Sequence, residues 1–180
     1  MKIRDLYFFF FLVLLTGFVY PLFVTGVGMV FFPAKRLGAL HAGVSDLVFQ
    51  PYAGDAYFQG RPSASEYSTV PSGASNLSPG SPKLLEEVEK RKKYWEAKVP
   101  GVKVPSELLF TSGSGIDPHL SLEAVEYQVP VVVAARGGGV ELEKAVRKII
   151  QECSHETILT DRKIVSVNAL NRKLDFLRTR

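Results

Sequence analysis

The stretch Leu6–Phe32, "LYFFFFLVLLTGFVYPLFVTGVGMVFF", decides the fold because it carries no charged side chain over 27 residues. At about 1.5 Å of rise per residue it would form a helix roughly 40 Å long, enough to cross a bilayer with some tilt. A signal peptide usually has a shorter apolar region that ends at small residues, whereas this run continues into the bulky "MVFFPAKR". We therefore predict a transmembrane anchor over residues 1–33, with a buried core helix as the alternative, and a soluble domain over residues 34–180.

The charges around this run do not fix its orientation. Lys2 and Arg4 precede it and Lys35 and Arg36 follow it, so the basic residues that normally mark the cytoplasmic side are balanced. The formal net charge of +4 is spread along the chain, and the basic "KRKKYWEAK" is offset by the acidic "EEVEK" before it. This pattern indicates a solvated helix face, and we predict no nucleic-acid partner.

The cysteine and histidine positions argue against a metal site. Cys153 is the only cysteine, so the chain has neither an internal disulfide nor a CxxC-type metal motif. His41 and His155 have no acidic or histidine neighbours at metal-ligand spacing. We predict no metal site, and we expect Cys153 to be a small buried side chain in an apolar helix.

The rest of the chain alternates helical and strand patterns. Residues 33–69 are rich in Gly, Pro, Ser and aromatic residues, which indicates short strands and turns. The helices and strands that we expect after them are a helix over 82–97 capped by Ser81, a strand over 108–110, a helix from 122 capped by Ser121, another from Pro130 stopped by Gly137–Gly139, a helix over 141–153, and a final strand and helix in "KIVSVNALNRKLDFL". The predicted fold class is α+β: one N-terminal transmembrane helix followed by a single mixed helix/strand soluble domain.

The stretch Thr111–Ser121, "TSGSGIDPHLS", combines small residues with an acid and a histidine. Ser112 or Ser114 with Asp117 and His119 would supply the residue types of a hydrolytic triad, but the strand-to-helix "GxSxG" elbow is missing. As a phosphate-binding loop the stretch lacks the lysine of a P-loop. We favour a structural loop, with Asp-Pro-His as a turn that shapes a contact surface.

The apolar run itself contains small residues along one face. Gly17, Pro21 and Thr25 lie at four-residue intervals, and close packing through small residues is what holds helices together in lipid. Pro21 has no N–H and leaves a carbonyl near Gly17 without its usual bond, which a partner helix or Thr16 could satisfy. The partner-binding residues that we predict in the span are Gly17, Tyr20, Pro21, Thr25 and Gly26.

Five motifs occur in the order and approximate spacing of a known family. They are "LLTGFVYPLFVTG", "YFQGRPSAS", "SGASNLSPGSP", "TSGSGIDPHLSLEAVEYQVP" and "VNALNRKLD", and together they span Leu14 to Asp175. The chain thereby resembles the C subunit of the Kdp potassium-transporting P-type ATPase complex. It departs from the family pattern at "GAL", residues 38–40, at "VSDLVFQPY", residues 44–52, and in a shortened segment between Leu40 and Val44, which affects the expected strand pairing near the membrane.

The resemblance implies a non-catalytic accessory subunit of a high-affinity potassium uptake complex. Its partners would be a P-type ATPase subunit, a potassium-channel-like subunit and membrane lipid. The family role is that of a catalytic chaperone that raises ATP affinity, so ATP and potassium are handled by the complex and no cofactor is assigned to this chain. The alternatives are a membrane-anchored serine hydrolase and a stand-alone extracytoplasmic binding module.

Family topology implies a single-pass protein of the cell membrane, with a cytoplasmic N-terminus and an extracytoplasmic domain. Because ATP is cytoplasmic, any help with ATP would then pass through subunit packing. Gln128 is the expected residue for a nucleotide-linked polar role. The residues expected to bind a partner or to form the structural loop are Arg61, Ser112, Gly113, Ser114, Gly115, Asp117 and His119.

Overall fold

The computed structural model describes residues 3–33, 40–41, 44–157 and 160–177, and it divides the chain into two compact units. One unit comprises Met1–Ser45 and the other Asp46–Arg180. The flanking charges of Lys2, Lys35 and Arg36 and part of the "GAL" departure lie outside the described residues. An apolar N-terminal helix and a mixed helix/sheet unit confirm the α+β prediction.

The first unit consists mainly of one long apolar helix. α1 (Ile3–Leu14) continues through a π-helical turn, η1 (Leu15–Val19), into α2 (Tyr20–Phe31). The 29-residue stretch Ile3–Phe31 is long and apolar enough to cross a membrane, and none of its hydrophobic window is buried within the protein. β1 (Leu40–His41) and β2 (Val44–Ser45) follow as a two-residue antiparallel ribbon.

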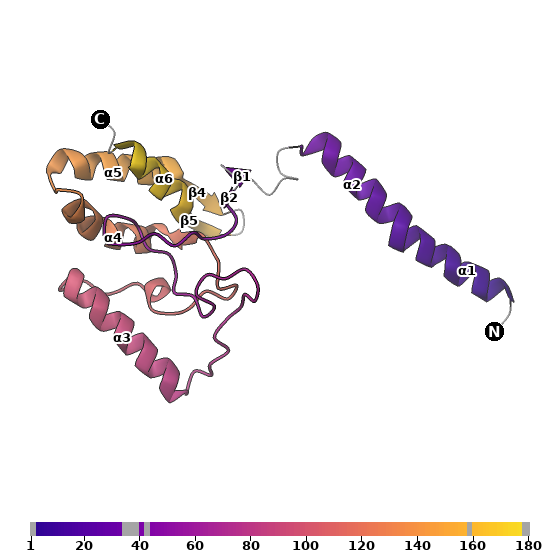
Figure 1. Cartoon of the computed structure of the whole chain (residues 1–180), viewed down its shortest axis with the longest axis horizontal. Helices are drawn as coiled ribbons and strands as arrows, with labels where there is room; N and C mark the ends of the chain where they lie inside the picture. The colour runs from indigo at the N-terminus through magenta and orange to yellow at the C-terminus, as the bar shows by residue number, and fades with distance from the viewer. Residues whose placement is uncertain (1–2, 34–39, 42–43, 158–159, 178–180) are drawn as a thin grey trace. The chain divides into compact units, whose positions relative to one another are not determined.

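The second unit is built on a three-stranded antiparallel sheet. Its strand order is β3 (His119–Ser121), β5 (Thr160–Ser166), β4 (Ser154–Thr157). Leu120 and Val165 face each other across β3 and β5 and are at most 1% exposed. Helices α4 (Leu122–Ala135), α5 (Val140–Cys153) and α6 (Val167–Leu177) all contact β5, and α5 also contacts α4 and α6 (Figure 1).

Helix α3 (Pro82–Lys98) is attached to this unit through aromatic contacts. The Trp95 ring lies edge-on to the Tyr127 ring of α4 at 6.0 Å between centroids. The Tyr127 hydroxyl also donates a hydrogen bond to the Trp95 carbonyl at 3.2 Å. The helix predicted over residues 82–97 is thus confirmed, and its one buried residue is the tryptophan.

Several local predictions are confirmed. The Ser121 hydroxyl accepts the Ala124 N–H at 3.3 Å and caps α4. Gly137–Gly139 have positive φ angles of 107°, 71° and 105°, which stop α4 and lead into α5. Cys153 is buried at the end of α5, and burial raises the pKa of its thiol. The final strand and helix appear as β5 and α6.

The prediction that Pro130 begins a helix is wrong, because it lies inside α4. Proline breaks the bond to the carbonyl four residues earlier, that of Glu126. Both Glu126 and Pro130 are at least partly exposed, so the break lies on the outer side of the helix. Burial of Val125, Val129 and Val132 in the core holds the two halves of the helix in line.

Two strand predictions are also wrong. Leu108 lies in a 3-10 turn, η3 (Ser106–Leu108), rather than in a strand. The turn is closed by a hydrogen bond from the Leu108 N–H to the Pro105 carbonyl at 3.0 Å. No described residue between 46 and 69 forms a strand. The part of this region over Asp46–Arg61, which we call the strap, crosses the second unit without regular secondary structure but with Phe49, Phe58 and Gly60 buried.

Candidate functional site

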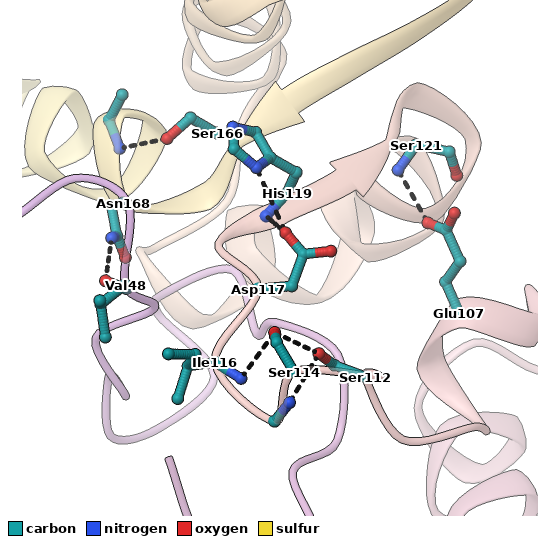
Figure 2. Close-up of polar contacts among 12 residues, drawn as sticks. Val48, Glu107, Ser112, Ser114, Ile116, Asp117, His119, Ser121, Ser166 and Asn168 are labelled. Atoms are coloured by element: carbon teal, nitrogen blue, oxygen red, sulfur yellow. Dashed lines mark hydrogen bonds and ion pairs between the residues drawn. The ribbon is translucent and has the colours of Figure 1, made fainter. Parts of the chain in front are cut away.

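The serine hydroxyls of the Thr111–Ser121 loop hold the loop in its turn. Ser112 Oγ accepts the Gly115 N–H at 3.1 Å, and Ser114 Oγ accepts the Ile116 N–H at 3.2 Å (Figure 2). The two hydroxyl oxygens lie 3.2 Å apart, and Ser112 is only 2% exposed. These hydroxyls are engaged with backbone amides, as expected of a structural loop.

Asp117 and His119 form a turn at the entrance to β3. Asp117 Oδ1 accepts the His119 backbone N–H at 3.0 Å and lies 3.2 Å from the His119 Nδ1 (Figure 2). The hydrogen bond from the imidazole lowers the pKa of Asp117, and burial opposes this effect only in part. The His119 ring lies edge-on to the His155 ring, at 5.9 Å between centroids. In the part of the chain that the structure describes, the contacts of His119 are therefore to Asp117 and His155 rather than to a serine hydroxyl.

The glycines of the loop differ in how closely they are packed. Gly115 has a φ of +75°, and a Cβ there would lie 2.7 Å from both the Gly73 carbonyl oxygen and Ser65 Oγ. A Cβ at Gly113 would meet no atom within 4 Å. The loop therefore packs against the segment around residues 65–73 through Gly115 and leaves Gly113 on the open side.

Arg61 connects the strap to the loop. Its Nη2 donates to the Thr111 carbonyl at 3.3 Å, and its own carbonyl accepts the Tyr67 hydroxyl at 3.1 Å. Its Nε is buried and has no hydrogen-bond partner among the described residues. The Arg61 charge also contributes, as the smallest of several causes, to lowering the pKa of Asp117.

Three buried side-chain amides bind the backbone of the strap. Asn168 Oδ1 accepts the Gln50 N–H at 3.0 Å, and its Nδ2 donates to the Val48 carbonyl at 2.7 Å. Asn171 accepts the N–H and donates to the carbonyl of Phe58, both at 2.9 Å. Each amide thus presents a donor and an acceptor to the strap, as a neighbouring strand would.

Gln128 is the third of these amides. It is 1% exposed, and its Oε1 accepts the Gln59 N–H at 2.8 Å. Its Nε2 donates to the Gln59 carbonyl at 3.1 Å and to the Ala124 carbonyl at 3.2 Å. The residue expected to have a nucleotide-linked role therefore lies inside the domain and bonds to its backbone.

Sequence reasoning did not identify Asn168 and Asn171 as important residues. The available signal is their spacing: two asparagines three residues apart in "VNALNRKLD" lie on one face of α6, among apolar residues. Both are at most 1% exposed. A polar amide on a buried helix face requires a hydrogen-bond partner, and in this protein the partner is the strap.

Arg136, at the C-terminal end of α4, is a second centre of strap contacts. Its Nε donates to the Ala56 carbonyl at 2.6 Å and its Nη1 to the Leu174 carbonyl at 2.9 Å. Its guanidinium lies 4.9 Å from the centre of the Tyr57 ring. A cavity of about 310 Å³ lies beside these groups, lined by Ala56, Tyr57, Ala135, Arg136, Leu142 and Leu177.

The larger hollow of about 740 Å³ lies at the N-terminal end of α4 and carries mixed charge. Lys103, Glu107 and Glu123 are among its lining residues. The Glu107 carboxylate accepts the Ser121 N–H at 2.7 Å, so this acid already occupies the helix terminus (Figure 2). No group of three metal-binding side chains occurs among the described residues.

In the apolar helix, the structure places Gly17 inside the π-helical turn and Pro21 two residues after its end, as the second residue of α2. A Cβ built at Gly17 or at Gly26 would meet no atom within 4 Å, so both positions are open to a neighbour. Tyr20 is 63% exposed. The Thr16 hydroxyl donates to the Leu12 carbonyl at 2.7 Å. Its proton therefore does not go to the carbonyl near Gly17, and of the two donors that the sequence suggested for that carbonyl a partner helix remains.

Comparison with known proteins gives one consistent result. Residues 3–176 match the family described as "KdpC: K+-transporting ATPase, c chain". A potassium-transporting ATPase KdpC subunit of Pseudomonas putida is 46% identical over 170 residues, covering 91% of this chain and 90% of that protein. The corresponding subunit of Pectobacterium atrosepticum is 37% identical over 180 residues, covering 95% and 94%. The chain therefore belongs to the KdpC family, the C subunits of potassium-transporting ATPases.

Proposed function

We propose that this chain stabilises a potassium uptake complex and raises the ATP affinity of its P-type subunit, without performing chemistry itself. The observation that carries the proposal is family membership along nearly the whole chain, including the apolar helix. The partners are a P-type ATPase subunit, a potassium-channel-like subunit and the surrounding lipid. Residues 1–33 serve as the anchor and residues 34–180 as the accessory domain.

The assistance with ATP is indirect in this proposal. The N-terminus is cytoplasmic and the domain extracytoplasmic, so the chain acts through packing against its partners rather than by contact with the nucleotide. The bonding of the Gln128 amide to Gln59 and Ala124 supports this view, because that amide is already used within the domain.

Steady-state kinetics test the proposed role. The two large subunits are purified with and without this chain, and potassium-stimulated ATPase activity is measured against ATP concentration. We expect the KM for ATP to be higher without the chain and to fall when the purified chain is added back. An unchanged KM in complexes that assemble normally would contradict the chaperone role and leave only a role in assembly.

Thiol labelling tests the topology. Ser68 is exposed, so Ser68→Cys in a Cys153→Ala background should react with a membrane-impermeant maleimide in cells whose cell membrane is intact. The layers of the cell envelope outside that membrane are first made permeable to the reagent. Asp5→Cys, near the start of α1, is the matched control and should react only after lysis. The opposite pattern would reverse the proposed orientation.

The contact face of the anchor is tested by filling it. Gly17→Leu combined with Thr25→Leu raises hydrophobicity, so membrane insertion should be kept while co-purification with the large subunits is lost. Phe23→Leu with Val30→Leu changes two apolar residues on the opposite side of the helix from the proposed face and should retain the complex. Equal recovery of both double variants would show the anchor to be a passive tether.

The loop is tested by removing its polar groups. If it is structural, Ser114→Ala and His119→Ala should leave potassium transport largely intact at equal complex yield. A loss of turnover of about a thousandfold with normal assembly would instead be the size expected for removal of a catalytic group.

A further inference from the structure

The π-helical turn changes which carbonyl of the apolar helix lacks a donor. The Tyr20 N–H donates to the Leu15 carbonyl, five residues back, rather than to the Thr16 carbonyl four residues back. At five-residue spacing the donor for Thr16 would be residue 21, which is Pro21 and has no N–H. The Thr16 carbonyl thus loses both of the backbone donors that the helix could offer.

The side chains beside this carbonyl do not replace the lost donor. The Thr16 hydroxyl has one proton, and it is donated to the Leu12 carbonyl at 2.7 Å. Gly17, Phe18 and Val19 have no side-chain donor. At Gly17 the space where a Cβ would stand is open to 4 Å, so a neighbouring group can approach the backbone at this point.

The membrane environment of the Thr16 carbonyl makes it an acceptor for a hydrogen bond from a neighbouring helix. A membrane-spanning segment has no bulk water to satisfy an exposed carbonyl, and helices broken by proline are tolerated where a neighbour supplies the missing bond. Resting on the proposed function, we infer that η1 is the docking point for a transmembrane helix of a transport subunit that carries a hydroxyl or carboxamide side chain. That side chain donates its hydrogen bond to the Thr16 carbonyl.

The first test restores the missing donor within the helix. Pro21→Ala supplies an N–H at residue 21, so the carbonyl no longer needs a partner. Leu22→Ala is the matched control, since it shortens an exposed apolar side chain at the same depth and keeps the backbone pattern. We expect Pro21→Ala to lower the fraction of the full-length chain that co-purifies with the large subunits by about three- to twentyfold relative to Leu22→Ala.

The second test identifies the chemistry of the partner. Each Ser, Thr, Asn and Gln in the spans of the large subunits is replaced by an apolar residue of similar size, in the presence of either the wild-type chain or Pro21→Ala. One replacement should weaken the wild-type complex and have no further effect with Pro21→Ala. If no replacement depends on Pro21 in this way, or if Pro21→Ala alters only self-association of this chain, the inference is overturned. Failure of the wild-type chain to co-purify at all would instead overturn the proposed function.

Discussion

The strap and the segment over residues 70–80 both lack helix and strand, yet they differ in how they are held. The strap buries Phe49, Phe58 and Gly60 and bonds to three buried amides. Most of residues 70–80 is exposed, with no fully buried residue. Irregular backbone can therefore be as fixed as a strand when its N–H and C=O groups have permanent partners. Three substitutions test this difference, and a fourth tests the neighbouring Thr111–Ser121 loop; they follow from the largest expected effect to the smallest.

The largest effect should follow from removing an amide that binds the strap. Asn171→Leu keeps a similar volume but leaves the buried N–H and carbonyl of Phe58 without partners. We expect a loss of about 2–4 kcal/mol in the free energy of unfolding. Urea unfolding of the full chain in detergent, followed by fluorescence of Trp95, measures it. Gln151→Leu removes an exposed amide on α5 and should change little; equal losses would show that the strap bonds are unimportant.

The next effect comes from a methyl group placed inside the strap. At Gly60 a Cβ would lie 2.6 Å from the Phe49 ring, which is only 2% exposed and has little room to move. Gly60→Ala should therefore destabilise the domain by about 1–3 kcal/mol. The same unfolding curves measure this change, and a variant as stable as the parent would mean that the ring shifts freely.

A smaller effect should appear at acid pH through Asp117. Its pKa is lowered in the folded protein, so the stabilisation is present above the ordinary value of about 4 and is lost as the pH falls through the lowered folded value. The unfolding free energies of wild type and Asp117→Asn are compared from pH 6 down to about pH 2. The advantage of the wild type should shrink only at the acid end; a constant difference would rule out the ionised form as the cause.

The smallest effect should be seen in the exposed segment. Gly80 has open space around the position of a Cβ and no positive φ, in contrast to the crowded Gly60. Gly80→Ala should change the unfolding free energy by no more than about 0.5 kcal/mol. A loss as large as that of Gly60→Ala would show that the two segments are held alike.

The periodic parts of the second unit could be predicted from the sequence because their signals are local. The helix start at Ser81-Pro82, the side-chain cap at Ser121 and the glycine stop at residues 137–139 lie within a few positions of what they control, although the Ser81 side chain makes no capping hydrogen bond. The strap could not, since the amide of Asn168 is 118 residues from its partner Gln50 and Asn171 is 113 from Phe58. Apolar runs such as "DLVF" indicate strands when read alone, and only the folded chain shows that their bonds go to side chains.

In the candidate site, too, the sequence predicts the local contacts but not the long-range ones. The turn at Asp117 and the bonding of the loop serines follow from short-range side-chain-to-backbone preferences, which sequence can indicate. The burial of Gln128 against Gln59 depends on a pairing across 69 residues. The π-helical turn before Pro21 shifts the hydrogen-bond register by one residue, a change that the presence of proline alone does not specify.

The strap also sets the route by which mechanical load would enter the domain. Asp46, its first residue, pairs with Arg172 of α6, and the bond from Asn168 to Val48 lies only two residues further along the chain. Tension arriving along the polypeptide from the N-terminal side would therefore fall first on bonds to α6. Asn168, Asn171 and Arg172 all belong to that helix, so most of the first bonds to resist the pull lie on α6, together with the bond from the Phe49 N–H to the Ile116 carbonyl at 2.8 Å.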